Sequence, residues 1–182
     1  LHEAGLFRYH QPARVGGMEL DFVAIVDLCA EIARGCASTA WNVGNLGNHH
    51  FILALYPERA QEEVWSRSSD HLVASALAFP SGSGRKVDGG FVISGDWSFS
   101  SGVDASEWNM CAVAIKDSPD GPIVDHRLCL LHKGEYEVTD NWYAAGLKGT
   151  GSKAVRCKDV FVPTHRVLSM YVAREGHVWP GN

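Results

Sequence analysis

The sequence predicts an α+β fold in which a helical segment precedes an antiparallel β-barrel. Up to about residue 65, apolar residues recur at spacings of three and four, whereas after Asp70 the spacing becomes two. The strand-like runs are short and are separated by clusters of Gly, Pro, Asp and Ser. Because helices and strands occupy separate parts of the chain, we expect a segregated fold and not a doubly wound parallel sheet.

The first and third helices are predicted from their apolar stripes and their ends. The first runs from about Leu20 to Arg34, and Gly35 follows it as a C-terminal cap. The third is short and has the sequence PERAQEEVW, with Pro57 at its start, where the missing N–H of proline does no harm.

A second helix is expected between them, capped by Ser38 or Thr39 and ending at Leu55. It contains Gly44 and Gly47, and each glycine within a helix costs about 1 kcal/mol relative to alanine. We therefore expect another part of the chain to pack closely against that helical face.

After residue 70 the period-2 pattern predicts five strands. They cover His71–Ala78, Phe91–Phe99, Asn109–Ile115, Arg127–His132 and Ala154–Val162. The expected domains are a helical domain at residues 1–70, a barrel domain at 71–166 and, at 167–182, the start of a helical domain. The remainder of that last domain, a C-terminal helical bundle, is expected to be absent from this chain.

Composition excludes several classes of function. The chain has 182 residues, 46% of them hydrophobic, and a formal net charge of -5, which offers no basic face for nucleic acid. No apolar run is long enough to span a membrane. The five cysteines show no spacing typical of a metal site and indicate free thiols in a reducing compartment, so the cytoplasm is expected.

Residues 89–108 carry the most information about function. Phe91, Ile93, Trp97 and Phe99 share one parity and predict a strand with one buried face. The turn after them, Ser100–Gly102, places two hydroxyls and an open backbone beside the aromatic rings. A flat heteroaromatic cofactor needs apolar area against its face and hydrogen-bonding groups at its edge. The alternative is a barrel corner with a buried tryptophan.

Three further features have both a structural and a functional interpretation. The run GLKGTGSK resembles a phosphate loop, but it lies between strands and its Ser and Lys are in the wrong order, so a glycine-rich turn is favoured. His49 and His50 have no carboxylate partner at helical spacing, so we expect no metal site. One of the two shares a helical face with Trp41. Ser75 is a core hydroxyl or a site residue.

Read in order, these segments resemble the acyl-CoA dehydrogenase superfamily over nearly the whole chain. The resemblance rests on AW…NHH, ASALAFP, SGDWSFSSGVD, DNWYAAGLKGTGSK and FVP. Within the superfamily, the chain is more similar to the oxygenase components of two-component flavin monooxygenases, such as 4-hydroxyphenylacetate and secosteroid hydroxylases. This narrower likeness rests on STAW, SSGVD, DNWYAAGLKGTGSK and FVP. Acyl-CoA dehydrogenases usually have Thr-Glu-Pro where this chain has Ala78-Phe79-Pro80, which weakens the dehydrogenase alternative.

The resemblance implies roles for individual residues. Ser100 corresponds to the hydroxyl beside flavin N5, His49 to the histidine that meets a substrate phenol, and Ser75 to its orienting partner; His50 is the alternative to His49. An imidazole titrating near neutrality would polarise or deprotonate the phenol. The implied cofactor-binding residues are Trp41, Leu77, Ala78, Phe79, Phe99, Ser100 and Ser101, and Trp97 would join the aromatic wall of the cavity.

The function implied is hydroxylation of a phenolic or other aromatic small molecule with dioxygen and reduced FMN or FAD. A separate NAD(P)H:flavin reductase would supply the reduced flavin, and a homotetramer is expected. Two alternatives remain open from the sequence: a flavin-dependent acyl-CoA dehydrogenase and a non-enzymatic binding module.

Overall fold

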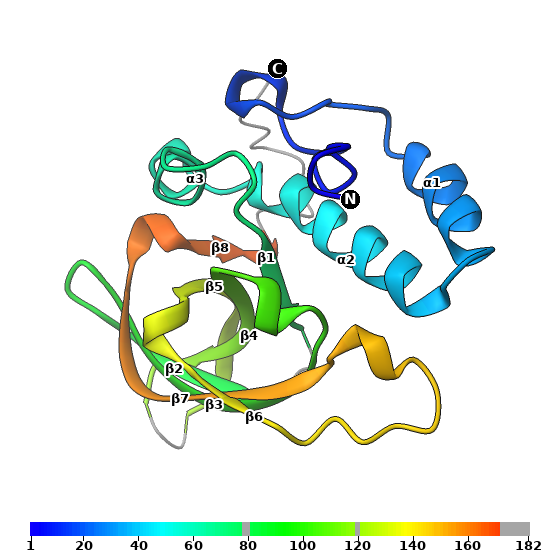
Figure 1. The fold of residues 1–182 in the computed structure, drawn as a ribbon. Helices are drawn as coiled ribbons and strands as arrows, with labels where there is room; N and C mark the ends of the chain where they lie inside the picture. The colour runs from blue at the N-terminus through cyan, green and yellow to red at the C-terminus, as the bar shows by residue number, and fades with distance from the viewer. Residues whose placement is uncertain (78–80, 119–120, 172–182) are drawn as a thin grey trace.

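Three α-helices form the first part of the protein in a computed structural model that describes residues 1–77, 81–118 and 121–171. They are α1 (Ala24–Ala33), α2 (Ala37–Leu53) and α3 (Glu58–Trp65), and all three confirm the expected helical segments. Helix α2 lies between α1 and the sheet (Figure 1). The expected cap of α2, Ser38 or Thr39, was wrong, because the helix begins two or three residues earlier. Its N-cap is Cys36, and no side chain caps it.

Close packing against α2 explains its glycines. A Cβ atom on Gly47 would lie 2.2 Å from Cε1 of Tyr9, and one on Gly44 would lie 2.7 Å from Sγ of Cys29. The Tyr9 hydroxyl also donates a hydrogen bond to the carbonyl of Gly44 at 2.9 Å. The N-terminal segment and α1 therefore hold α2 against the rest of the protein, as the glycine spacing predicts.

The second part is an eight-stranded sheet in the order β6-β7-β3-β2-β4-β5-β8, with β1 also paired to β4. Its strands are β1 (Val73–Ala76), β2 (Gly82–Val87), β3 (Gly90–Ser100), β4 (Trp108–Lys116), β5 (Ile123–His132), β6 (Glu137–Thr139), β7 (Lys153–Pro163) and β8 (Val167–Ser169). Short 3₁₀ turns connect them, among them η2 (Val103–Ala105) and η4 (Lys148–Thr150). Most pairs are antiparallel, as expected, but β1 and β2 both run parallel to β4.

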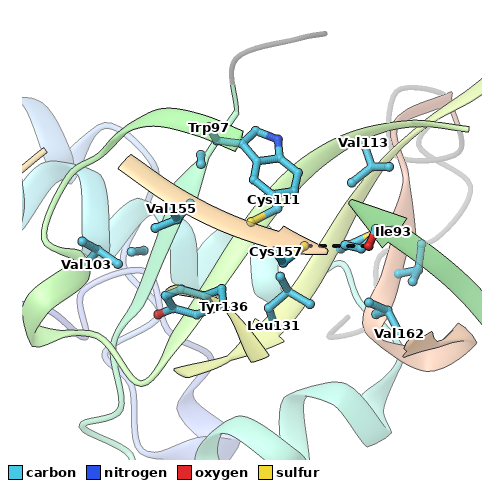
Figure 2. Packing of buried hydrophobic residues seen from close by; sticks show 14 of the residues in the cluster. Ile93, Trp97, Val103, Cys111, Val113, Leu131, Tyr136, Val155, Cys157 and Val162 are labelled. Carbon is cyan, nitrogen blue, oxygen red and sulfur yellow. Dashed lines mark hydrogen bonds between the residues drawn. The ribbon is translucent and has the colours of Figure 1, made fainter. Parts of the chain in front are cut away.

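The inner face of the curled sheet encloses the main core (Figure 1). Side chains from β3, β4, β5 and β7 meet there, including fully buried Trp97, Cys111 and Val155 (Figure 2). The indole Nε1 of Trp97 donates to the carbonyl of Ala112 at 2.7 Å, so its one polar group is satisfied inside the core. Trp97 is therefore part of the barrel core, and the expectation that it walls a cofactor cavity was wrong.

A second core lies on the outer face of β4 and β5. There Tyr56, Val64 and Trp65, from α3 and the segment before it, pack against Met110 and Leu130. Because β4 is covered on both faces, its first eight residues are all buried. This explains why β4 reads as a nearly continuous apolar run and not as an alternating one.

The period-2 pattern missed three strands. Only one of the six residues of β2 is buried, and all three residues of β6 are exposed. Strand β8 pairs with β5 through Val167–Ser169, so the sheet extends three residues past the expected domain boundary. The division into residues 1–70, 71–166 and 167–182 stays a prediction.

Candidate functional site

A pocket of about 320 Å³ lies where α2 meets the sheet. Its walls combine aromatic and aliphatic side chains with five hydroxyls and one amide, and no charged side chain among the described residues lines it. The lining residues are Trp41, Asn45, Ser75, Leu77, Ser98, Phe99, Ser101, Trp142, Leu147, Thr150 and Ser152. The volume falls within the roughly 300–1,000 Å³ typical of small-molecule sites.

Ser75 connects this pocket to a buried histidine. Its hydroxyl lies 2.8 Å from Nε2 of His49, whose Nδ1 lies 2.7 Å from the carbonyl oxygen of Val73. A carbonyl only accepts, so Nδ1 carries the proton and Nε2 of the neutral ring is an acceptor. The Ser75 hydroxyl therefore donates to His49 and presents its lone pairs to the pocket.

Burial keeps His49 neutral. The side chain is 2% exposed. Desolvation lowers the pKa of the imidazole from 6.5 to about 4, although the hydrogen bond with the Val73 carbonyl acts to raise it. The expectation of an imidazole titrating near neutrality was therefore wrong. The physical reason is that the ring lies behind Ser75 and, within the described part of the chain, has no acidic partner to stabilise its charged form.

His50 faces a different part of the protein. Its ring packs edge-on against Trp65, with centroids 5.5 Å apart and an interplanar angle of 89°. The pKa of His50 is lowered to about 3. Burial is the larger cause, and the nearby His49 is the second. Only His49 of the two adjoining histidines reaches a pocket-lining residue, because neighbours on a helix point about 100° apart.

The two serines after Phe99 point in opposite directions. Ser101 lines the pocket, whereas the side chain of Ser100 is fully buried and accepts a hydrogen bond from Nδ2 of Asn109 at 2.9 Å. The assignment of Ser100 as the pocket hydroxyl is therefore not supported by its geometry. Ser101 takes that place in the structure.

An irregularity in β3 explains the difference. The pairing of β3 with β7 shifts between Trp97 and Ser100, and Phe99 has a φ of 68°. The shift breaks the parity that would have buried Phe99 beside Trp97. Phe99 is instead 65% exposed at the pocket and packs edge-on against Trp142.

Of the other predicted cofactor-binding residues, Trp41, Leu77, Phe99 and Ser101 line the pocket together. Ala78 and Phe79 lie outside the described residues. Sequence reasoning missed Asn45, Ser98, Trp142, Leu147, Thr150 and Ser152. Three of these, Leu147, Thr150 and Ser152, stand in the run that resembles a phosphate loop, and the glycines around them were the available signal.

The described residues show neither a cluster of metal ligands nor a membrane-spanning helix. Within them, no three His, Cys, Asp or Glu side chains come together as a set of metal ligands. No α-helix in the same part of the chain has the length and hydropathy needed to cross a membrane.

Comparison with known proteins shows what the chain is similar to. Residues 1–67 match the family described as acyl-CoA dehydrogenase, N-terminal domain. The chain is 42% identical over 172 residues, 93% of its length, to the flavin-dependent monooxygenase oxygenase subunit HsaA of Rhodococcus jostii, covering 44% of that protein. It is 38% identical over its whole length to the oxygenase component of the FADH2-dependent resorcinol hydroxylase of Rhizobium sp., covering 44% of it.

A solved structure agrees with the sequence comparisons. The crystal structure of the 3-HSA hydroxylase from Rhodococcus sp. RHA1 superposes with a TM-score of 0.93 at 40% identity, covering 100% of this chain and 46% of the other. The chain thus spans less than half the length of these relatives. Its first 67 residues are similar to the acyl-CoA dehydrogenase N-terminal domain, and the chain as a whole is similar to the oxygenase components of flavin-dependent hydroxylases.

Proposed function

We propose that the protein carrying this chain is the oxygenase component of a two-component flavin-dependent monooxygenase. Its substrate would be a phenolic or other aromatic small molecule, hydroxylated with dioxygen and reduced flavin. The observation that carries this proposal is the Ser75–His49 pair at the wall of an aromatic pocket. The similarity to named oxygenase components supports it.

The residues around the pocket fit an isoalloxazine ring. Such a ring needs apolar walls for its faces and neutral hydrogen-bonding groups for its edge. Trp41, Phe99 and Leu147 supply the apolar walls. Ser101 and Asn45 supply the hydrogen-bonding groups for the edge. When bound, reduced flavin would supply the two electrons that activate dioxygen. FADH2 is the form named for the resorcinol hydroxylase relative, and we extend it to this protein within the proposal.

Ser75 and His49 would act on the substrate hydroxyl. A phenol O–H entering the pocket can donate to Ser75, whose own proton already points at Nε2 of His49. With the pKa of His49 at about 4 and that of a phenol near 10, full proton transfer from the resting phenol is unfavourable. The pair instead polarises the O–H bond of the bound phenol.

Proton transfer becomes favourable as the ring attacks oxygen. The ring loses electron density at that moment, so its hydroxyl turns strongly acidic and Ser75 can pass the proton on to His49. A group that accepts a proton only in the transition state lowers the barrier without binding the substrate more tightly. His49 is therefore assigned the general base and Ser75 the relay.

We also propose the remaining partners of this reaction. A separate NAD(P)H:flavin reductase would supply the reduced flavin, because the relatives are named as components or subunits. Assembly as a homotetramer and a cytoplasmic location are part of the same proposal.

The test uses the full-length protein with a flavin reductase, NADH and a panel of phenols under ¹⁸O₂. Incorporation of one ¹⁸O atom into a hydroxylated product, dependent on both proteins, is the expected result. An acyl-CoA dehydrogenase would instead retain oxidised flavin through purification and reduce it anaerobically with an acyl-CoA. That outcome, with no labelled phenol product, would overturn the proposal.

A further inference from the structure

Four consecutive hydrogen bonds run through the wall of the pocket. Trp41 Nε1 lies 3.0 Å from Ser101 Oγ, which lies 2.7 Å from Ser152 Oγ. Ser152 Oγ lies 2.6 Å from Thr150 Oγ1, which lies 2.9 Å from the carbonyl oxygen of Leu147. We refer to these five residues as the hydroxyl chain. It joins α2, the turn after β3 and the η4–β7 segment, and all five residues line the pocket.

Both ends of the hydroxyl chain have a fixed direction. The indole N–H of Trp41 only donates, and the carbonyl of Leu147 only accepts. Each hydroxyl between them has a single proton. All four hydrogen bonds can exist together in one arrangement only, in which Ser101 donates to Ser152, Ser152 to Thr150 and Thr150 to Leu147.

This arrangement decides what Ser101 can offer to a ligand. Its proton is directed at Ser152, and one of its two lone pairs accepts from Trp41. What remains for the pocket is one lone pair, so Ser101 is an acceptor there. Ser101, Thr150 and Ser152 are at most 6% exposed, so solvent does not compete freely for these protons.

We propose that Thr150 and Ser152 are positioning residues that make the pocket prefer reduced over oxidised flavin. The inference rests on the proposed function, since it takes flavin as the ligand. Oxidised isoalloxazine has an acceptor at N5, whereas reduction places a proton there and turns N5 into a donor. A Ser101 hydroxyl that only accepts can take a hydrogen bond from the N5 proton of reduced flavin. It cannot donate one to the unprotonated N5 of oxidised flavin.

The hydroxyl chain can also be reversed at a cost. For Ser101 to donate into the pocket, its proton must leave Ser152. If Ser152 then donates to Ser101, the bond from Ser152 to Thr150 is lost, because Thr150 still donates to Leu147. The preference is therefore worth about one net hydrogen bond, equivalent to a factor of roughly 2 to 12 in relative affinity.

Two substitutions remove the fixed direction while keeping Ser101. Ser152→Ala takes away the acceptor of the Ser101 proton. Thr150→Val is close to isosteric and takes away the acceptor of the Ser152 proton, so Ser152 is free to donate to Ser101. The carbonyl of Leu147 keeps two other donors in that variant, the Thr150 amide at 3.1 Å and Trp142 Nε1 at 3.2 Å. Thr150→Ser keeps the hydroxyl and is the matched control.

The experiment measures dissociation constants of the full-length protein for both redox forms of one flavin. Oxidised flavin is titrated by fluorescence and reduced flavin anaerobically by absorbance, with circular dichroism as a check on folding. We expect the wild type and Thr150→Ser to bind the reduced form more tightly. The preference is the dissociation constant of oxidised flavin divided by that of reduced flavin. In Ser152→Ala and Thr150→Val, this ratio should fall by roughly 2- to 12-fold.

The outcomes separate this inference from the proposed function. If both folded variants bind flavin with the wild-type ratio, the hydroxyl chain does not set the preference and the inference is wrong. If Thr150→Ser loses the preference as fully as Thr150→Val, the hydroxyl is not the cause, and the inference is again wrong. A folded wild type that binds neither form would overturn the proposed function itself.

Discussion

Replacing His49 by alanine should uncouple oxygen consumption from hydroxylation. In the proposed reaction the imidazole is the proton acceptor behind Ser75, and its Nε2 accepts a hydrogen bond from the Ser75 hydroxyl at 2.8 Å. Without it, Ser75 can still accept from a phenol but cannot pass its own proton on. Oxygen activation depends on the flavin and should persist, so the unused oxidising equivalents should leave as hydrogen peroxide.

The size of the effect follows from the burial of His49. General-base assistance contributes about 10²- to 10⁴-fold in rate and is greatest when the pKa of the base is near the working pH. Because burial lowers the pKa of His49 to about 4, we expect the lower end, about 10². The same pKa predicts a level coupling ratio between about pH 6 and pH 8, since the base is neutral throughout that range.

The assay is the ratio of hydroxylated product to NADH consumed, with hydrogen peroxide measured alongside. His50→Ala is the matched control, because it also removes a fully buried imidazole but one that packs against Trp65. We expect His50→Ala to lose stability and keep its coupling. Wild-type coupling in His49→Ala would refute the assigned general base. A wild-type coupling ratio that falls with a midpoint near pH 6.5 would refute the neutral, buried state.

Three further predictions concern the core, the turn after β3 and acid stability. Trp97→Ala should lower the free energy of unfolding by about 3–5 kcal/mol, because it empties a fully buried site; an unchanged urea midpoint would contradict this. Ser101→Ala should weaken binding of reduced flavin, whereas Ser100→Ala should change only stability, and titration of both variants decides between the two serines. The folded-state pKa values of His49 and His50 lie below the unfolded value of 6.5, so the unfolded chain binds more protons below that pH. The free energy of unfolding should therefore fall as the pH drops from about 6.5 towards 4. Urea titrations at several pH values test this.

The helical part of the fold could be predicted because its signals are local. The apolar spacing in α1 and α2 and the proline before α3 act within a few residues, and the structure confirms all three helices. Gly44 and Gly47 also predicted a close contact, although not that Tyr9 and Cys29 would make it. Strands β2 and β6, which have few buried side chains, could not be found in this way, since pairing with neighbours and not side-chain burial makes them strands.

The candidate site was predictable only in part, because two of its features depend on contacts across the chain. Ser75 and His49 are 26 residues apart, and only the packing of α2 on β1 shows that they form a pair. That packing also buries the imidazole and moves its pKa away from neutrality. From the sequence alone, a histidine on a helix gives no information about its degree of burial.

The positions of Ser100 and Ser101 show why a period-2 pattern fails to assign strand faces beyond an irregularity. A strand pattern assigns faces by counting, and one irregular residue reverses every assignment after it. Here the shift in β3 places Phe99 at the pocket, turns Ser100 into the core and leaves Ser101 facing the ligand. The same shift makes the hydroxyl chain possible, because only a serine on the pocket side can accept from Trp41 and donate to Ser152. The irregularity thus determines which hydroxyl lines the pocket and in which direction its proton points.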